Sequence, residues 1–183
     1  MRPSSRGRIL DAAVRVVERD GITALTLDAA AEGAGVSKGG LIYHFPSRDA
    51  LLTAIQAHLT TRWEALLLAE LTVPVEESTP AERTAAYAAV CAGGGTGAAD
   101  LAFMMESASD PALAEAWSEL TRRWVAPPVS AGAAEIDALV ARLAADGLWL
   151  GDSVGGGGQL EPAVRAAVVR RIIELTGAAP SVG

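Results

Sequence analysis

The chain has 183 residues, enough for one large domain or two small ones, and half of them are apolar, so it can bury a core. Abundant alanine and few alternating Val, Ile and Thr residues favour an all-α fold over a sheet. The single cysteine, Cys91, excludes an internal disulfide framework and a CxxC metal site, and no apolar run approaches the roughly 18 residues that a membrane span needs. We therefore expect a soluble, cytoplasmic protein with neither metal nor cofactor.

The net charge of −7 is unevenly distributed along the chain. Residues 1–49 carry seven of the 15 Lys and Arg residues and six of the 22 Asp and Glu residues, which leaves a charge of −8 on the remaining chain. Such an asymmetry indicates that the two ends of the chain have different partners.

Three helices are expected in the first 47 residues. The first is amphipathic and ends at Gly21. Thr26 is the expected N-cap of the second, "LDAAAEGA", which Gly35 ends. Ser37 is the expected N-cap of the third, which runs to about residue 44.

The rest of the chain is predicted to form longer helices. Ser47 in "PSRDALL" is an N-cap signal for a fourth helix, whose apolar residues repeat every three or four positions. "TPAE" at residues 79–82 has the form of a capping box with proline at the first helical position, and "CAGGGTG" ends that fifth helix. Further helices are expected from Pro111, over about residues 133–150 and over about residues 162–175, with a flexible "GDSVGGGGQ" segment between the last two. The expected fold is therefore all-α, with eight or nine helices in total.

Residues 29–44, "AAAEGAGVSKGGLIYH", have the pattern of a helix-turn-helix. Small side chains are needed where the two helices touch, and three alanines supply them: Ala30, Ala31 and Ala34. Gly35 accepts a left-handed turn without a Cβ penalty, and Val36 follows as an apolar plug. Leu41 and Ile42 are expected to form the buried face of the second helix. The alternative interpretation is a glycine-broken helical hairpin in an ordinary core.

The other face of that helix suits docking into a DNA major groove. Ser37 and Lys38 lie at its N-terminus, where free backbone N–H groups favour phosphate. Gly39 and Gly40 cost about 1 kcal/mol each in helix propensity relative to alanine, and close approach to the groove floor is a physical reason for their presence. With one lysine and small residues facing the bases, specificity is expected to depend partly on DNA shape.

The segment "TLDAAAEGAGVSKGGLIYHFPSRDALL" resembles the N-terminal domain of the tetracycline-repressor (TetR) family of bacterial transcription regulators. The resemblance covers about residues 6–52 in continuous register, and beyond it the chain resembles the family only in architecture. It implies a three-helix DNA-binding domain over residues 1–47 and a larger effector-binding and dimerisation domain over residues 48–183. The residues that it assigns to bases or phosphates of a double-stranded DNA operator are Thr26, Ser37, Lys38, Gly39, Gly40, Tyr43, His44 and Arg48, with Arg6 and Arg8 in an N-terminal arm.

The chain departs from the family pattern in two helices. Ile42 stands where the family commonly has tyrosine, and Tyr43 stands beside it, so the phosphate contact is expected from the neighbouring position. Gly33 is an additional glycine in the second helix, and Ala30 replaces a larger apolar residue.

The resemblance also implies a homodimer that binds a small-molecule effector. Apolar stripes on the last two helices are the expected dimer interface, although they could instead pack within one subunit: Ile136, Leu139, Val140, Leu143, Val164, Val168, Ile172 and Leu175. Large side chains on several helices are the expected effector pocket, although they could equally fill a core: Trp63, Leu67, Tyr87, Phe103, Met104, Trp117 and Trp124. In this family an effector shifts the population of two conformations. We expect the fourth helix to be the lever, through Trp63 and Leu67.

The expected function is a DNA-binding regulator, by family default a repressor, that releases its operator when a small apolar or amphipathic effector binds. An enzyme is disfavoured, because the chain has no HExxH, GxSxG, P-loop or Rossmann motif and His44 and His58 have no acid–base partner in the sequence pattern. The alternative is a small-molecule-binding helical protein that has lost specific DNA recognition. Salt dependence separates the two, because DNA docking loses affinity as the salt concentration rises.

Overall fold

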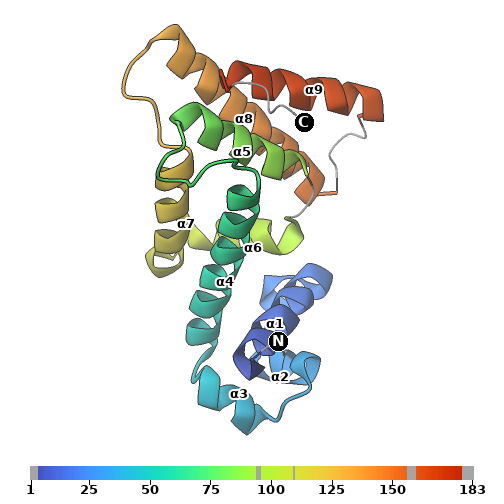
Figure 1. Cartoon of the computed structure of the whole chain (residues 1–183). Helices are drawn as coiled ribbons and strands as arrows, with labels where there is room; N and C mark the ends of the chain where they lie inside the picture. Colours follow the sequence, from blue (N-terminus) through green and yellow to red (C-terminus); the bar gives the residue numbers. More distant parts are fainter. Residues whose placement is uncertain (1–3, 94–95, 109, 156–159, 179–183) are drawn as a thin grey trace. The chain divides into compact units, whose positions relative to one another are not determined.

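The computed structural model describes residues 4–93, 96–108, 110–155 and 160–178 (Figure 1). Over these ranges the chain forms nine α-helices, one short 3-10 turn and no strand, which confirms the all-α prediction. The elements are α1 (Ser5–Asp20), η1 (Ile22–Ala24), α2 (Leu27–Ala34), α3 (Lys38–His44), α4 (Arg48–Ala69), α5 (Pro80–Ala92), α6 (Ala98–Ser107), α7 (Pro111–Trp124), α8 (Ala133–Ser153) and α9 (Pro162–Leu175). None of the helices in the described part of the chain is long and apolar enough to cross a membrane.

Most helix boundaries follow the capping signals in the sequence. Ser47 Oγ accepts a hydrogen bond from the Ala50 N–H at 3.1 Å, as predicted for the start of α4. Thr79 and Glu82 form the predicted capping box, because the Glu82 N–H donates to Thr79 Oγ1 at 3.2 Å and the Thr79 N–H donates to Glu82 Oε2 at 2.7 Å. These bonds satisfy N–H groups that the first turn of a helix otherwise leaves free.

The N-terminal arm is the first expectation that the structure corrects. Arg6 and Arg8 lie in α1, because Ser4 Oγ accepts a hydrogen bond from the Gly7 N–H at 3.1 Å and starts the helix at the next residue. The guanidinium carbon of Arg6 lies 5.3 Å from the centre of the Phe45 ring, a cation–π contact. The sequence "SSRG" contained this N-cap signal.

Helix α6 was not predicted as a separate element. Its N-terminus lacks Ser or Thr at the N-cap, and the Asp100 carboxylate instead accepts a hydrogen bond from the Gly97 N–H at 2.9 Å. The "GDSVGGGGQ" segment also differs, since α8 continues to Ser153. Residues 156–159 of this segment lie outside the described residues.

Contacts divide the chain into two compact units. The first comprises Met1–Arg62 with Gly97–Ser118, and the second comprises Trp63–Thr96 with Glu119–Gly183. Helices α4 and α7 each contribute residues to both units. The functional boundary expected between residues 47 and 48 stays a prediction.

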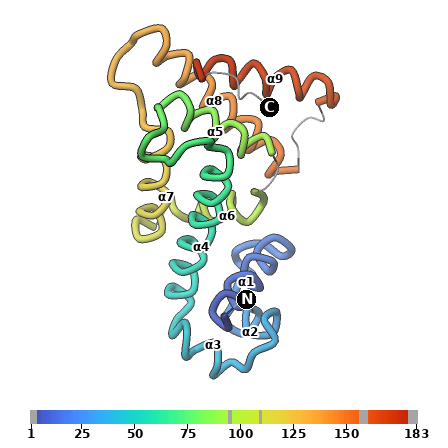
Figure 2. The backbone as a smooth tube through the Cα atoms, in the orientation of Figure 1, coloured from blue at the N-terminus to red at the C-terminus, as the bar shows by residue number. Residues whose placement is uncertain are grey.

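The core of the first unit combines residues that are distant in the sequence. Buried side chains of α1 to α4 form one cluster, and three residues from the later part of the chain join it: Ala99, Phe103 and Leu113. Helix α6 packs against α1 and η1, which brings Phe103 into this cluster. The backbone path through α1, α2 and α3 can be followed in Figure 2.

The second unit is built around α5, α8 and α9, which pack against one another. Ala141, Ala145 and Trp149 are buried at four-residue spacing along α8, so this face of the helix points into the unit. The small alanines allow close helix packing at one end, and the indole of Trp149 fills the other.

Candidate nucleic-acid interface and effector site

The turn between α2 and α3 has the predicted helix-turn-helix geometry. Gly35 adopts the left-handed region at φ 64°, which favours glycine, and the Val36 N–H donates to the Ala31 carbonyl at 3.0 Å to end α2. Ser37 then caps α3 by accepting a hydrogen bond from the Gly40 N–H at 3.1 Å. The local sequence therefore specifies both ends of the turn.

The buried face of α3 is only partly the one expected. Leu41 is fully buried, but Ile42 is exposed, so the prediction that Ile42 joins this face is wrong. Phe45, four residues after Leu41, is buried in its place. A spacing of four residues returns to the same side of a helix, whereas adjacent residues point about 100° apart.

The N-terminus and the exposed face of α3 present most of the predicted DNA-contacting residues of this helix to solvent. Ser37, Lys38, Gly39 and Gly40 are all exposed. The Tyr43 side chain is 85% exposed, with its ring centre 5.1 Å from that of the half-buried His44 in an edge-on arrangement. An aromatic side chain that contacts solvent so extensively contributes little to the core and is available to a partner.

The two glycines of α3 have different surroundings. A Cβ atom added to Gly40 would lie 3.2 Å from Ser37 Oγ, so glycine there makes room for the N-cap. A Cβ atom added to Gly39 would meet no described atom within 4 Å outside its own helix backbone and its chain neighbours. The described residues therefore give no reason for glycine at position 39.

Thr26 and Arg48 have structural partners within the first unit. Thr26 Oγ1 caps α2 by accepting a hydrogen bond from the Ala29 N–H at 3.0 Å. The half-buried Arg48 donates from Nε to the Leu25 carbonyl at 3.0 Å and from an Nη atom to the Ile22 carbonyl at 3.2 Å. Arg48 thus ties the start of α4 to the turn that precedes α2, a positioning role that the sequence pattern did not predict.

Lys38 forms an ion pair across the helix-turn-helix. Its Nζ atom lies 3.0 Å from Oδ2 of Asp28, in the first turn of α2, and both side chains are largely exposed. The charge that the sequence assigns to DNA therefore already has an anionic neighbour in the protein.

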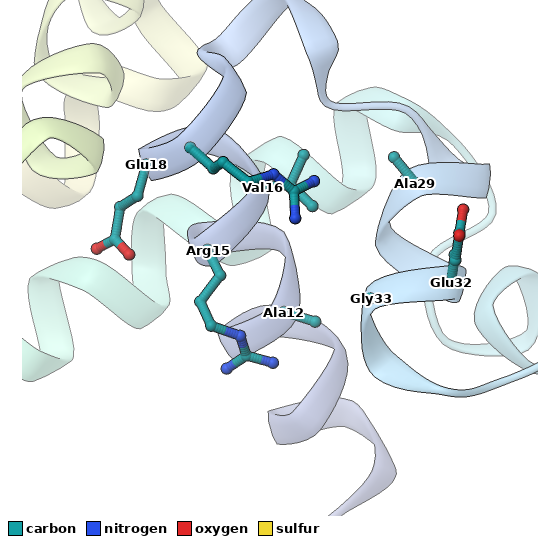
Figure 3. Close-up of a pocket in the computed structure, with 8 residues that line it drawn as sticks. Ala12, Arg15, Val16, Glu18, Ala29, Glu32 and Gly33 are labelled. Carbon is teal, nitrogen blue, oxygen red and sulfur yellow. The ribbon is translucent and has the colours of Figure 1, made fainter.

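A groove between α1 and α2 lies beside this motif (Figure 3). Its volume is about 730 Å³, and it is lined by Ala12, Arg15, Val16, Glu18, Arg19, Ala29, Glu32 and Gly33. Figure 3 shows Arg15 and Glu18 on α1 and Glu32 on α2 around small residues. None of the predicted DNA-contacting or effector-binding residues lines the groove, and charges of both signs border it.

An aromatic cluster occupies the second unit. The rings of Trp63 and Tyr87 are stacked with centres 6.0 Å apart, and Trp149 meets Trp63 edge-on with centres 5.9 Å apart. The Tyr87 hydroxyl donates to Asp146 Oδ1 at 2.7 Å, while Arg142 Nε lies 3.7 Å from the other oxygen of that carboxylate. Trp149 Nε1 is buried without a hydrogen-bond partner in the described chain.

Burial controls the ionisation of this cluster. It raises the pKa of the Tyr87 hydroxyl, and it raises the pKa of the nearby Cys91 thiol to about 12, with the Asp146 carboxylate adding to both effects. Both groups are therefore neutral at physiological pH. Cys91 is 1% exposed and so packs in the interior as a small side chain.

The structure distributes the predicted effector residues over both units. Trp63, Leu67, Tyr87 and Trp124 belong to the second unit, and Phe103, Met104 and Trp117 belong to the first. Trp63 and Tyr87 are in contact, whereas Phe103 is fully buried in the core of the first unit. Sequence reasoning missed Trp149 and Asp146. The four-residue spacing of Ala141, Ala145 and Trp149 was the signal that placed Trp149 inside.

The predicted dimer residues also divide by exposure. Ile136, Val140, Leu143 and Val164 are exposed, and Leu139, Val168 and Leu175 are half-buried. Ile172 is only 4% exposed and so packs within its own unit. Leu150 on α8 and Val154 at its C-cap, which the sequence reasoning missed, are also exposed.

Leu139 faces a second groove rather than the exposed stripe. This groove has a volume of about 460 Å³ and is largely apolar, with walls from the start of α5, the α7–α8 connection and α8. Arg142 lines it as well, and its guanidinium donates to the Val125 carbonyl at 2.9 Å.

The helix-turn-helix, its exposed α3 face and the separate helical unit define a DNA-binding regulator. The family described as bacterial regulatory proteins, tetR family, matches residues 9–55, and the tetracyclin repressor-like C-terminal domain matches residues 81–177, more than half of the chain. The chain therefore belongs to the TetR family. It is a transcription regulator and not an enzyme.

Individual relatives agree with this assignment. The HTH-type transcriptional regulator BetI of Paraburkholderia phymatum is 29% identical over 169 residues, covering 85% of each chain. A transcriptional regulator from Rhodococcus sp. Rha1 has a TM-score of 0.67 at 20% identity, covering 95% of both chains. The multidrug binding protein EbrR, solved with imidazole, has a TM-score of 0.61 at 22% identity, covering 99% of both chains. At these identities the two solved structures show a shared fold.

Proposed function

We propose that this regulator is a dimeric repressor that acts in the cytoplasm and docks α3 into the major groove of its operator. The observation that carries the docking is Gly39, since glycine weakens a helix and no described part of the protein needs it there. Close approach of α3 to the floor of the DNA major groove would explain the glycine at position 39. Lys38 and Ser37 then reach bases or phosphates, and the exposed Tyr43 contacts the DNA backbone.

The substitution Gly39→Ala tests this docking. It should raise the free energy of unfolding by up to about 1 kcal/mol, because alanine favours the helix, yet weaken operator binding at least about tenfold. The operator comes from selection of genomic fragments by the purified protein, and affinity is measured by fluorescence anisotropy at two salt concentrations. We expect the variant to be more stable and yet to bind the operator more weakly, and a glycine needed only for folding would not give this combination.

Gly33→Ala is the matched control. Gly33 also lies within a helix, and a Cβ atom there would be in ordinary contact with Ala12 Cβ at 3.6 Å. This variant should gain stability with no loss of operator affinity. Unchanged operator affinity in Gly39→Ala would count against the docking, and salt-insensitive binding would favour a protein that no longer reads DNA.

We propose the exposed stripe of α8, continued by Val164 of α9, as the dimer interface. Ile136, Val140 and Leu143 would be an unusually apolar surface on a monomer, and two-fold pairing removes them from water. A dimer also places two α3 helices for half-sites about 34–36 Å apart. Leu143→Asp should yield monomers in sedimentation experiments with unchanged helicity, because Leu143 is 60% exposed in the single chain.

Val129→Asp is the control for that substitution. Val129 is fully exposed in the α7–α8 connection and belongs to neither α8 nor α9, so the same change of apolar residue to aspartate should leave the dimer intact. If the Leu143→Asp variant remains dimeric, the interface lies elsewhere on the protein.

For the effector we propose an amphipathic aromatic molecule that binds at the Trp63, Tyr87 and Trp149 cluster. The three rings are buried against one another, so a bound aromatic molecule would separate and stack between them, and it would supply the acceptor that the buried Trp149 Nε1 needs. EbrR, which shares the fold, has been solved in complex with malachite green, an observation about that protein that suggests a first probe. Helix α4 carries Trp63 at one point and Arg48 at another, so a shift of α4 would reach the turn before α2 through the Arg48 hydrogen bonds.

Malachite green titration tests the effector proposal. We expect quenching of tryptophan fluorescence together with release of the operator, and weaker quenching in Trp149→Phe. A dye that binds tightly yet leaves operator affinity unchanged would contradict the mechanism, because only a ligand with different affinities for two states can shift their populations.

A further inference from the structure

Lys38, the only lysine in the sequence, forms an ion pair with Asp28. Lys38 is the first residue of α3 and Asp28 lies in the first turn of α2. The 3.0 Å separation of Nζ and Oδ2 joins the two helices of the motif on their exposed side. The side chains are 60% and 70% exposed, so nothing in the core requires this contact.

The helix dipoles disfavour one of the two charges and favour the other. A cation in the first turn of a helix opposes the helix dipole, so Lys38 is unfavourable for α3 by itself. An anion in the first turn is favourable, so Asp28 stabilises α2 and at the same time offsets the Lys38 charge. An exposed pair of this kind contributes no more than about 1 kcal/mol. Another anion of similar strength can therefore displace Asp28.

We propose that Asp28 is a competitor of DNA for Lys38 and thereby sets the DNA affinity of this regulator. The proposal rests on the docking of α3 described above. To contact DNA, the Lys38 ammonium must leave the Asp28 carboxylate, which is then unpaired beside a polyanion. The ion pair therefore lowers affinity for any duplex, whatever its sequence, because a phosphate replaces a carboxylate that was already bound.

The salt dependence should show the same exchange. Binding of a cation to DNA releases about 0.9 counterion per phosphate neutralised. In the wild-type protein the unpaired Asp28 takes up a cation again, which offsets part of that release. Removing the Asp28 charge should therefore make the slope of log K against log salt steeper, by up to about one.

A double-mutant cycle separates a competitor from a general repulsive charge. Asp28→Asn keeps the side-chain shape and should tighten binding about threefold to fivefold, both to the selected operator and to a shuffled duplex of equal length. Lys38→Met alone should weaken binding to both. In the Lys38→Met background the gain in DNA affinity from Asp28→Asn should disappear, because no lysine is then present for which the Asp28 carboxylate competes.

Glu32→Gln is the matched control. Glu32 is an exposed acid one turn after Asp28 on the same helix, and no ion pair joins it to Lys38 in the described residues. Its neutralisation should change the affinity less than about twofold. Thermal unfolding of each variant shows whether a change in binding reflects a change in folding.

The single lysine supplies a second readout. Acetylation with an N-hydroxysuccinimide ester, followed by mass spectrometry of the peptide that contains Lys38, should be slowed by operator DNA if Lys38 leaves Asp28 for the duplex. A gain from Asp28→Asn that persists in the Lys38→Met background would overturn the proposal in favour of through-space repulsion. No gain at all, with Lys38→Met still weakening binding, would overturn it while leaving the docking intact. Unchanged affinity in Lys38→Met would refute the docking itself.

Discussion

Phe103→Ala is the substitution that best tests how the middle of the chain is used. Phe103 is fully buried in the same cluster as Ile9 and Leu41, although it follows them by more than sixty residues. Truncation of a buried phenylalanine typically costs about 3–5 kcal/mol, from lost burial and from the cavity left behind. In a chain of this length each kcal/mol lowers the melting temperature by about 2–4 °C. The variant should therefore melt about 6–20 °C lower.

Circular dichroism at 222 nm measures the melting temperature, and hydrogen exchange at the α1 amides shows where the stability is lost. Met105→Ala on the same helix is the control, because Met105 is largely exposed and its truncation should stay within about 0.5 kcal/mol. If Phe103→Ala melts no lower than Met105→Ala, or if exchange in α1 is unchanged, Phe103 does not belong to the core. Its earlier interpretation as an effector contact would then regain support.

Three further predictions concern a cap, a positioning residue and a thiol. Thr79→Ala should cost about 1 kcal/mol in denaturant unfolding, because it removes the capping box of α5. Arg48→Met should lower the free energy of unfolding by about 1–3 kcal/mol, because it leaves the Leu25 and Ile22 carbonyls without their donor. Operator binding should weaken in parallel. Weaker binding with unchanged stability would instead indicate a direct contact of Arg48 with phosphate. Iodoacetamide should alkylate Cys91 at pH 8 at least about a thousandfold more slowly in the native protein than in denaturant.

The Cys91 result has a defined pH dependence. Burial raises the pKa of the folded thiol to about 12, above the value of about 8.5 for an unfolded chain. The folded state therefore holds the proton more tightly, and the stability that this contributes is complete below about pH 8.5 and is lost as the pH rises toward 12. Urea unfolding across that range should show the decrease for the wild-type protein, and a smaller decrease for Cys91→Ala.

The helix-turn-helix could be predicted in detail because its instructions are local. The caps Thr26, Ser37 and Ser47 each bond a backbone group three residues away, and Gly35 is needed by a single dihedral angle. Helix α6 was missed because its N-terminus uses Asp100 at the third helical position without a serine or threonine cap. Its short apolar pattern also does not distinguish a core helix from a pocket wall.

Burial and partner choice were the properties that sequence spacing left undecided. Periodicity selects a face of a helix but not the neighbour that covers it, so Ile42 was placed inside while Phe45 took that position. For Arg48 the sequence predicted a DNA contact, which stays a prediction, but not the hydrogen bonds to the Leu25 and Ile22 carbonyls. The sequence by itself determined the all-α class, the helix-turn-helix and the ends of most helices, because hydrogen bonds within a few residues specify them. Only the tertiary structure decided the placement of Phe103, the Trp63–Tyr87–Trp149 cluster and the Lys38–Asp28 pair, because each depends on helices that meet in space through the packing of the whole unit.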